Sequence, residues 1–91
     1  MQLEVTVPSL LRDCIDNQPY VFLEAGTLSE ALQRLLEGYP LLDMHLYDEA
    51  GKLRPHVLIF YNDESIAWLE RLDLPLRPGD RLTIVQNVSG G

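Results

Sequence analysis

Apolar and polar residues alternate strictly at the start of the chain. Over residues 2–7 the apolar side chains fall on one side and the polar ones on the other, and Pro8 ends the pattern. A period of two predicts a strand with one buried face. A wide loop of turn-forming residues then leads to a second apolar run at residues 20–23. We expect these two strands to form a hairpin.

The apolar spacing changes to that of a helix after Thr27. Thr27-Leu28-Ser29-Glu30 is a capping box, in which the threonine hydroxyl accepts from the Glu30 amide and the Glu30 carboxylate reaches back to the threonine amide. Gly38 and Pro40 are a standard helix stop. The apolar face of this helix is expected to be core: Leu28, Ala31, Leu32, Leu35 and Leu36. Residues 41–47 are apolar but short, and form either a further turn of helix or an irregular crossing.

The second half of the chain holds two more long apolar runs. Residues 57–61 are the most apolar stretch and predict a strand with little polar face. Residues 77–80, Arg-Pro-Gly-Asp, predict a tight turn that leads into a final strand at residues 81–85. Three residues between these strands are expected to cover one end of the core: Trp68, Leu69 and Leu72.

The order of these elements predicts an α+β fold. Strand, strand, helix, strand, short strand and strand, with a single amphipathic helix, indicate a mixed sheet packed on one main helix. We therefore expect a β-grasp (ubiquitin-like) domain. We place it at residues 1–85, followed by a flexible C-terminal tail at residues 86–91.

Composition narrows the class of protein. The chain has 91 residues, enough for one domain, and a formal net charge of −7 with Lys52 as its one lysine. Binding to nucleic acid needs basic patches, so we expect no nucleic-acid partner. The acidic surface suits either a basic protein partner or simple solubility. Neither a signal peptide nor a membrane span is visible, which predicts a cytoplasmic protein without a membrane partner.

The single cysteine, Cys14, carries little chemistry in this setting. One cysteine allows no internal disulfide and no multi-cysteine metal site. Asp13 and Asp16 flank it, and nearby negative charge disfavours the reactive thiolate. We therefore expect Cys14 to be a small apolar side chain at the core and to take no part in the chemistry of the protein.

The chain ends on Val88-Ser89-Gly90-Gly91, after a final strand without any ionisable side chain from Gln86 onward. Glycine has no Cβ, so such an ending threads a narrow channel and presents an unhindered carboxylate. No other charge would then be desolvated in the channel of a partner. The alternative interpretation is an idle terminus, since glycine is common at the frayed ends of domains.

These features together resemble the ubiquitin-like sulfur-carrier family, which includes the molybdopterin-synthase small subunit and the sulfur carriers of thiamine and cysteine biosynthesis. The resemblance covers nearly the whole chain. It rests on the element order, the turn Tyr61-Asn62-Asp63-Glu64, the run Leu76-x-Pro78-Gly79-Asp80-x-Leu82-x-Ile84, and the Val-Ser-Gly-Gly ending. Gly51-Lys52-Leu53 before an apolar strand looks most like the branch that serves cysteine and other specialised biosyntheses. Molybdopterin-synthase small subunits often have aromatic residues and prolines just before this ending, and residues 84–87 here have neither.

The resemblance implies a carrier rather than an enzyme. An activating enzyme of the ubiquitin-activating type, which adenylates and sulfurates, would use ATP to adenylate the Gly91 carboxylate and convert it to a thiocarboxylate. Gly90, Ser89 and Val88 would thread the channel of that enzyme. The carrier itself would bind no cofactor and no metal, and His45 and His56 lie far apart in sequence. A downstream sulfur-accepting synthase is a further implied partner, and a processing protease that trims a longer precursor is a possible one.

Alternation also marks a surface for docking. A single helix can cover only one face of the strand at residues 57–61. We expect Leu58 and Phe60 to lie on the other face and to form, with Val85, the surface that docks the activating enzyme. The competing interpretation is that Leu76 or residues 41–47 fold over them.

Two other functions share the same ending. A ubiquitin-like modifier would join Gly91 to a lysine of a target protein, and a noncovalent binding module would leave the ending idle. The final sulfur acceptor stays open among a pterin precursor, a thiazole precursor, an activated serine, a tRNA base and a secondary metabolite.

Overall fold

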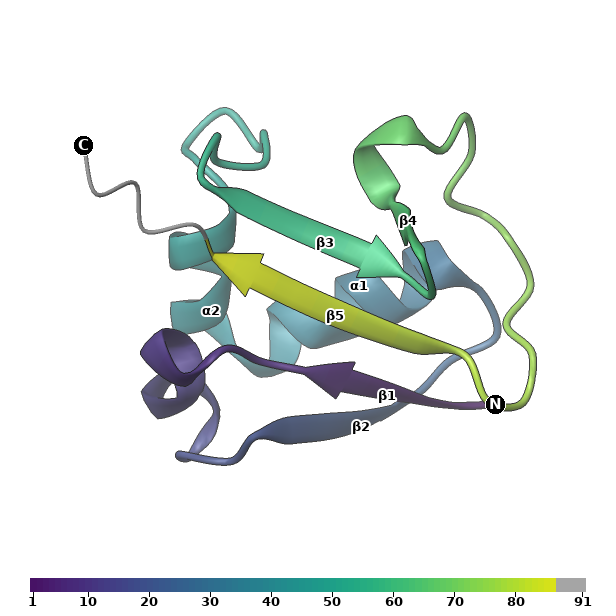
Figure 1. The fold of residues 1–91 in the computed structure, drawn as a ribbon, viewed down its shortest axis with the longest axis horizontal. Coiled ribbons are helices and arrows are strands. Elements are labelled where there is room, and N and C mark those ends of the chain that lie inside the picture. Colours follow the sequence, from purple (N-terminus) through teal and green to yellow (C-terminus); the bar gives the residue numbers. More distant parts are fainter. Residues whose placement is uncertain (87–91) are drawn as a thin grey trace.

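The computed structural model describes residues 1–86 and shows one mixed sheet with its helices on one side (Figure 1). The strands are β1 (Gln2–Thr6), β2 (Tyr20–Glu24), β3 (Val57–Tyr61), β4 (Glu64–Ser65) and β5 (Arg81–Gln86). The helices are α1 (Leu28–Gly38) and α2 (Pro40–Leu46), with the short 3-10 helices η1 (Ser9–Ile15) and η2 (Ile66–Trp68). None of the helices within residues 1–86 is long and apolar enough to cross a membrane.

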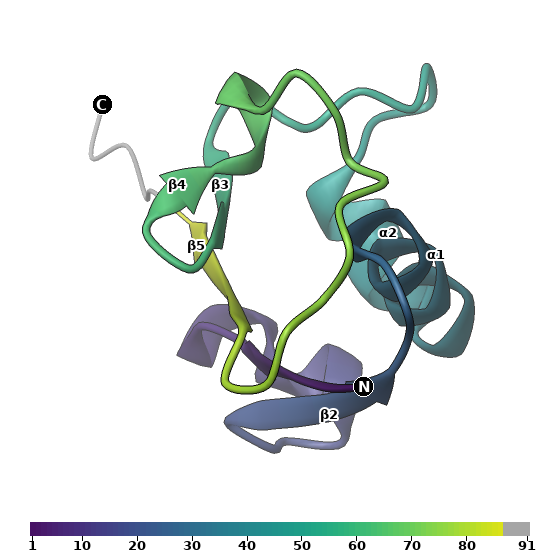
Figure 2. The ribbon, with the colours of Figure 1, turned by 90° about the vertical axis from the view of Figure 1, so that its right-hand side faces the viewer.

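The sheet has the order β2-β1-β5-β3-β4. β1 and β5 are parallel neighbours at its centre, whereas β1 with β2, β3 with β5 and β3 with β4 are antiparallel. Figure 2, turned by 90°, shows α1 and α2 on one side of the curved sheet. The mixed sheet and its main helix confirm the predicted β-grasp fold, including the hairpin of β1 and β2.

The core lies between the sheet and the helices. Every second residue along the central strands β1, β3 and β5 points inward. These residues are at most 2% exposed: Leu3, Val5, Val57, Ile59, Leu82 and Ile84. They meet the predicted apolar face of α1, of which Leu36 alone is half-buried. Residues 41–46 are helical as part of α2, which adds Leu42 and Leu46 to the core, and Tyr47 follows the helix in an extended conformation.

Three details differ from the sequence-based expectations. The wide loop after β1 contains η1, which is held in place by buried Leu11 and Ile15. Thr27 does accept from the Glu30 amide at 3.2 Å, but the Glu30 carboxylate accepts from the Gly26 amide at 2.9 Å and not from that of Thr27. The expectation that Trp68 covers the core is wrong, because its side chain is 87% exposed. Within η2 it is Ile66 that points inward, and Leu69 packs against the core beside it.

A hydrogen-bonded cluster joins the turn after β3 to the turn before β5. The Asp80 carboxylate accepts from the Tyr61 hydroxyl, from the Asn62 amide group at 3.1 Å and from the Arg77 backbone amide at 2.9 Å. The Asn62 side-chain oxygen in turn accepts from the backbone amide of Arg81 at 3.1 Å. The turn motifs at residues 61–64 and 77–80 are therefore one unit, which sets the register in which β5 enters the sheet.

This cluster predicts a loss of stability at alkaline pH. Burial, then the hydrogen bond to Asp80 and the charge of that carboxylate, raise the pKa of Tyr61 to about 12. An unfolded tyrosine titrates near pH 10, so folding favours the protonated phenol. Its stabilising contribution is complete below about pH 10 and is lost as the pH rises toward 12.

Tyr61→Phe should lower the free energy of unfolding by about 1 kcal/mol at pH 7, because one hydrogen bond is lost. It should also make the remaining stability less sensitive to pH above 10. Urea unfolding of both proteins from pH 8 to 11.5 measures this. Tyr47→Phe removes a second phenol, whose pKa is raised by burial and by Asp43, and so measures the part of the alkaline loss that comes from Tyr47. An alkaline loss in Tyr61→Phe as large as in the wild type would show that the Tyr61 phenol does not cause it.

Candidate functional site

The outer face of the sheet, opposite the helices, carries the three residues expected to dock a partner. Leu58 and Phe60 alternate with the buried Val57 and Ile59 along β3, and both are half-buried. Val85 of β5 stands directly across from Leu58 in the antiparallel register. Such facing pairs have Cβ atoms within about 5.5 Å of each other. We call Leu58, Phe60 and Val85 the outer apolar patch.

The competing interpretation, in which other segments fold over this patch, does not match the structure. Residues 41–47 lie in and just after α2, on the helical side of the sheet (Figure 1). The Leu76 amide donates to the carbonyl of Gly26 at 3.0 Å, which ties this buried leucine to the segment before α1. The patch is thus open to a partner, whereas its role in docking stays a prediction.

A second apolar area lies at the far edge of the same face. Tyr20 and Phe22 of β2 are 47% and 53% exposed, and their rings meet edge to face at a centroid separation of 6.0 Å. The central strands separate this pair from the outer apolar patch, with Thr6 of β1 beside Thr83 of β5. Threonines at this place divide the outer face into two apolar areas with a polar strip between them.

The outer apolar patch adjoins the point where the described chain ends. Val85 is followed by Gln86, which pairs with Val57 as the last residue of β5. Val88, Ser89, Gly90 and Gly91, on which the expected chemistry falls, lie outside the described residues. Five residues of extended chain span at most about 18 Å.

The position of Cys14 agrees with a structural role. The side chain is half-buried in η1 and packs against the core. Burial, and then the charge of Asp13, raise the pKa of its thiol. Both effects disfavour the thiolate, which is the form of cysteine that reacts with sulfur donors and disulfides.

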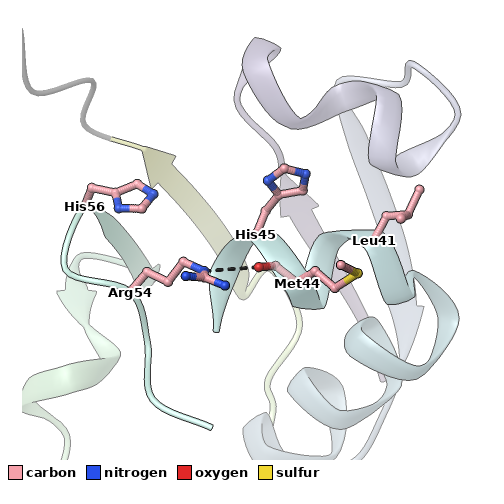
Figure 3. A pocket seen from close by; sticks show the side chains of 5 residues that line it. All are labelled: Leu41, Met44, His45, Arg54 and His56. Atoms are coloured by element: carbon pink, nitrogen blue, oxygen red, sulfur yellow. Dashed lines mark hydrogen bonds between the residues drawn. The ribbon is translucent and has the colours of Figure 1, made fainter. Parts of the chain in front are cut away.

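The fold brings His45 and His56 into one surface hollow, although the two residues are distant in sequence (Figure 3). Arg54 stands between them, and its Nε donates to the Met44 carbonyl at 3.1 Å. Leu41 completes the lining, so no carboxylate or thiol lies there to orient a histidine or complete a metal site. Within residues 1–86 no three His, Cys, Asp or Glu side chains gather in a way that would hold a metal ion.

Comparisons with known proteins show the family of this chain. The sequence matches the ThiS family over residues 5–91. The sulfur carrier protein CysO of Mycobacterium tuberculosis is 31% identical over 93 residues, with both chains covered completely.

Two solved structures extend this likeness. One chain of the Amycolatopsis orientalis BexX/CysO complex has a TM-score of 0.79 and 26% identity, over 98% of this chain and 99% of that one. The small archaeal modifier protein 1 of Methanosarcina acetivorans has a TM-score of 0.74 and 27% identity, over 99% of this chain and 96% of that one.

A carrier acts as a substrate of its partners. The family match spans nearly the whole sequence, and a relative that is matched over its full length is a sulfur carrier protein. The chain belongs to the ThiS family of ubiquitin-like sulfur carriers and is a sulfur carrier protein, not an enzyme.

Proposed function

We propose that the carboxylate of Gly91 is the group that carries sulfur. In the first step this carboxylate attacks the α-phosphorus of ATP within an activating enzyme, forming an acyl adenylate and releasing pyrophosphate. In the second step hydrosulfide, supplied by a sulfur donor, displaces AMP and leaves a thiocarboxylate. Adenylation is needed because a carboxylate is a poor electrophile, whereas AMP is a good leaving group. ATP is therefore a substrate of the partner and not a cofactor of the carrier.

The observation that carries this proposal is the position of the outer apolar patch beside the end of β5. Leu58 faces Val85, which is the residue before Gln86 at the end of β5. A protein docked on this pair would therefore lie next to the start of the C-terminal segment. Exposed apolar patches on small proteins usually mark interaction sites. The Amycolatopsis structure is a complex that contains a CysO protein, which supports a protein partner for this chain. Val88, Ser89 and Gly90 would thread the enzyme, and glycine at the penultimate position suits a narrow channel.

The thiocarboxylate would then serve a downstream synthase. Its sulfur is nucleophilic and displaces the leaving group of an activated acceptor, which forms a thioester. Hydrolysis of that thioester leaves the sulfur on the acceptor as a thiol and returns the Gly91 carboxylate. The likeness to CysO supports a biosynthetic acceptor, with cysteine, a cofactor or a secondary metabolite as the product classes. We place this cycle in the cytoplasm, where ATP and reduced sulfur donors are available.

A second candidate function is protein modification, in which the adenylated Gly91 forms an isopeptide bond with a lysine. The likeness to a small archaeal modifier protein supports it. The two functions differ in their products. Incubation of the carrier, the activating enzyme and ATP with cell extract would yield conjugates of higher mass that survive reductant and denaturant only if modification takes place. Since Lys52 is the one lysine of the chain, self-conjugates would be restricted to that residue.

A further inference from the structure

A groove lies beside the outer apolar patch and extends it toward η2. It has a volume of about 300 Å³ and a mainly apolar lining. The residues that line it come from β3, the following turn, β4 and η2: Leu58, Phe60, Asp63, Glu64, Ser65 and Trp68. We call it the Trp68 groove. It shares Leu58 and Phe60 with the outer apolar patch, so the two surfaces are continuous.

The Trp68 side chain forms one wall of the groove and is the most exposed large apolar side chain in the described part of the molecule, at 87%. The indole ring is nevertheless held on a fixed backbone. Ile66, two residues earlier, is buried, and the Ser65 hydroxyl accepts from the Ala67 amide at 3.4 Å at the start of η2. The Leu69 amide closes the turn on the Ile66 carbonyl at 3.2 Å. A rigid turn that holds a tryptophan outward spends little conformational entropy when a partner binds it.

Carboxylates form the rim on the turn side of the groove. The Asp63 side chain is 95% exposed and lies 3.5 Å from the guanidinium of Arg81. Glu64 is exposed and makes no ion pair with any residue of the 1–86 segment. An apolar floor with an acidic rim fits a segment that offers an apolar side chain next to an arginine or lysine.

The same charges argue against other occupants. A second copy of this chain would bring its own net charge of −7 and, in a twofold pairing, would place the two acidic rims together. A volume of about 300 Å³ is at the lower limit of small-molecule pockets. The dimensions therefore suit a few side chains of a basic protein segment.

We infer that the Trp68 groove binds a basic segment of the activating enzyme, with an apolar side chain of that segment between Trp68 and Phe60 and a cationic one against Glu64. This inference rests on the proposed function, because it names the chemistry of the partner surface that meets the outer face. The outer apolar patch contributes buried apolar surface to the interface. The groove contributes a pocket for one apolar side chain and a carboxylate that favours a positively charged partner. Tryptophans in such positions often contribute most of the binding free energy of an interface.

The test uses the fact that Trp68 is the one tryptophan of the chain. Full-length carrier is prepared with fluorotryptophan, and its single fluorine NMR resonance is followed while the unlabelled activating enzyme is added. Binding in the groove moves this resonance. Kd is measured in parallel by calorimetry at low and at physiological salt.

Two variants and two matched controls give the expected pattern. Trp68→Ala should raise Kd about tenfold or more. Glu64→Lys should raise it about tenfold at low salt, with the difference shrinking as salt screens the charges. Leu10→Ala removes another exposed apolar side chain in η1, and Glu37→Lys makes the same charge change on α1. Both controls should bind like the wild type.

Several results would overturn the inference. The first is a Kd within twofold of the wild type for both Trp68→Ala and Glu64→Lys. The second is a fluorine resonance that stays in place when the enzyme binds. The third is a resonance that moves with carrier concentration alone, which would assign the groove to a second copy. Pyrophosphate exchange by the same enzyme distinguishes the two proposals. Normal exchange with unchanged Kd values overturns the groove alone, whereas no exchange with the wild-type carrier overturns the proposed function as well.

Discussion

Removing Gly91 is expected to abolish adenylation and leave the folded domain intact. The proposed reaction takes place at the carboxylate of this residue, and a chain that ends at Gly90 presents its carboxylate one residue short of the reacting centre. Among the described residues 1–86 the buried core runs from Leu3 to Ile84, and we expect thermal unfolding to be nearly unchanged. ATP–pyrophosphate exchange by the activating enzyme, measured with full-length and shortened carrier at equal concentration, gives the comparison.

Gly90→Val is the companion variant. It keeps the Gly91 carboxylate but adds a β-branched side chain where a narrow channel is expected, so exchange should also fail. Lys52→Arg is a suitable control, because it alters a residue in the turn between α2 and β3 and keeps its charge. Exchange that persists with the shortened carrier would rule out the Gly91 carboxylate as the reacting group.

Placing a carboxylate in the outer apolar patch should weaken the binding of the carrier to its activating enzyme. Leu58→Asp puts a charge on the half-buried outer surface of β3, where solvent still reaches it. The domain should therefore remain folded. Association should weaken by at least about tenfold, or about 1.4 kcal/mol, because the charge must be desolvated against an apolar partner surface. Calorimetric titration and circular dichroism measure the two effects separately.

The adjacent residue provides the matched control. Ile59 is 1% exposed and points into the core, so Ile59→Asp should unfold the domain. The same chemical change at two successive positions of β3 thus separates docking from packing. If Leu58→Asp unfolds the protein as Ile59→Asp does, Leu58 belongs to the core. If Leu58→Asp folds and binds normally, the outer apolar patch is not the docking surface.

Short-range patterns were sufficient to predict most of this fold. The alternation at the start of the chain and the capping box at Thr27 are local signals, and each marks an element that the structure confirms. The apolar run at residues 57–61 likewise predicted β3, with Leu58 and Phe60 on the face away from the helices. Each of these signals lies within a few consecutive residues of the element that it marks.

Two features that depend on contacts between distant residues were not predicted. The clustering of Asp80 with Tyr61 and Asn62 joins residues 18 or more positions apart, and only the pairing of β3 with β5 brings them together. The exposure of Trp68 was missed for a related reason. Ile66 and Trp68 are both large apolar residues in one short turn, and either side chain could point into the core. Which of them does so depends on the hydrogen bonds that orient η2.

The most direct test of the central claim is the mass of the carrier after sulfur transfer. Carrier, activating enzyme, ATP and a sulfur donor are incubated, and the intact protein is weighed by mass spectrometry alongside carrier isolated from its native host. Exchange of one carboxylate oxygen for sulfur adds about 16 Da, and we expect fragmentation to assign this gain to Gly91. The Cys14→Ser carrier should gain the same mass. A gain that instead resides on Cys14, and that disappears in Cys14→Ser, would contradict the thiocarboxylate account and indicate a thiol-based carrier.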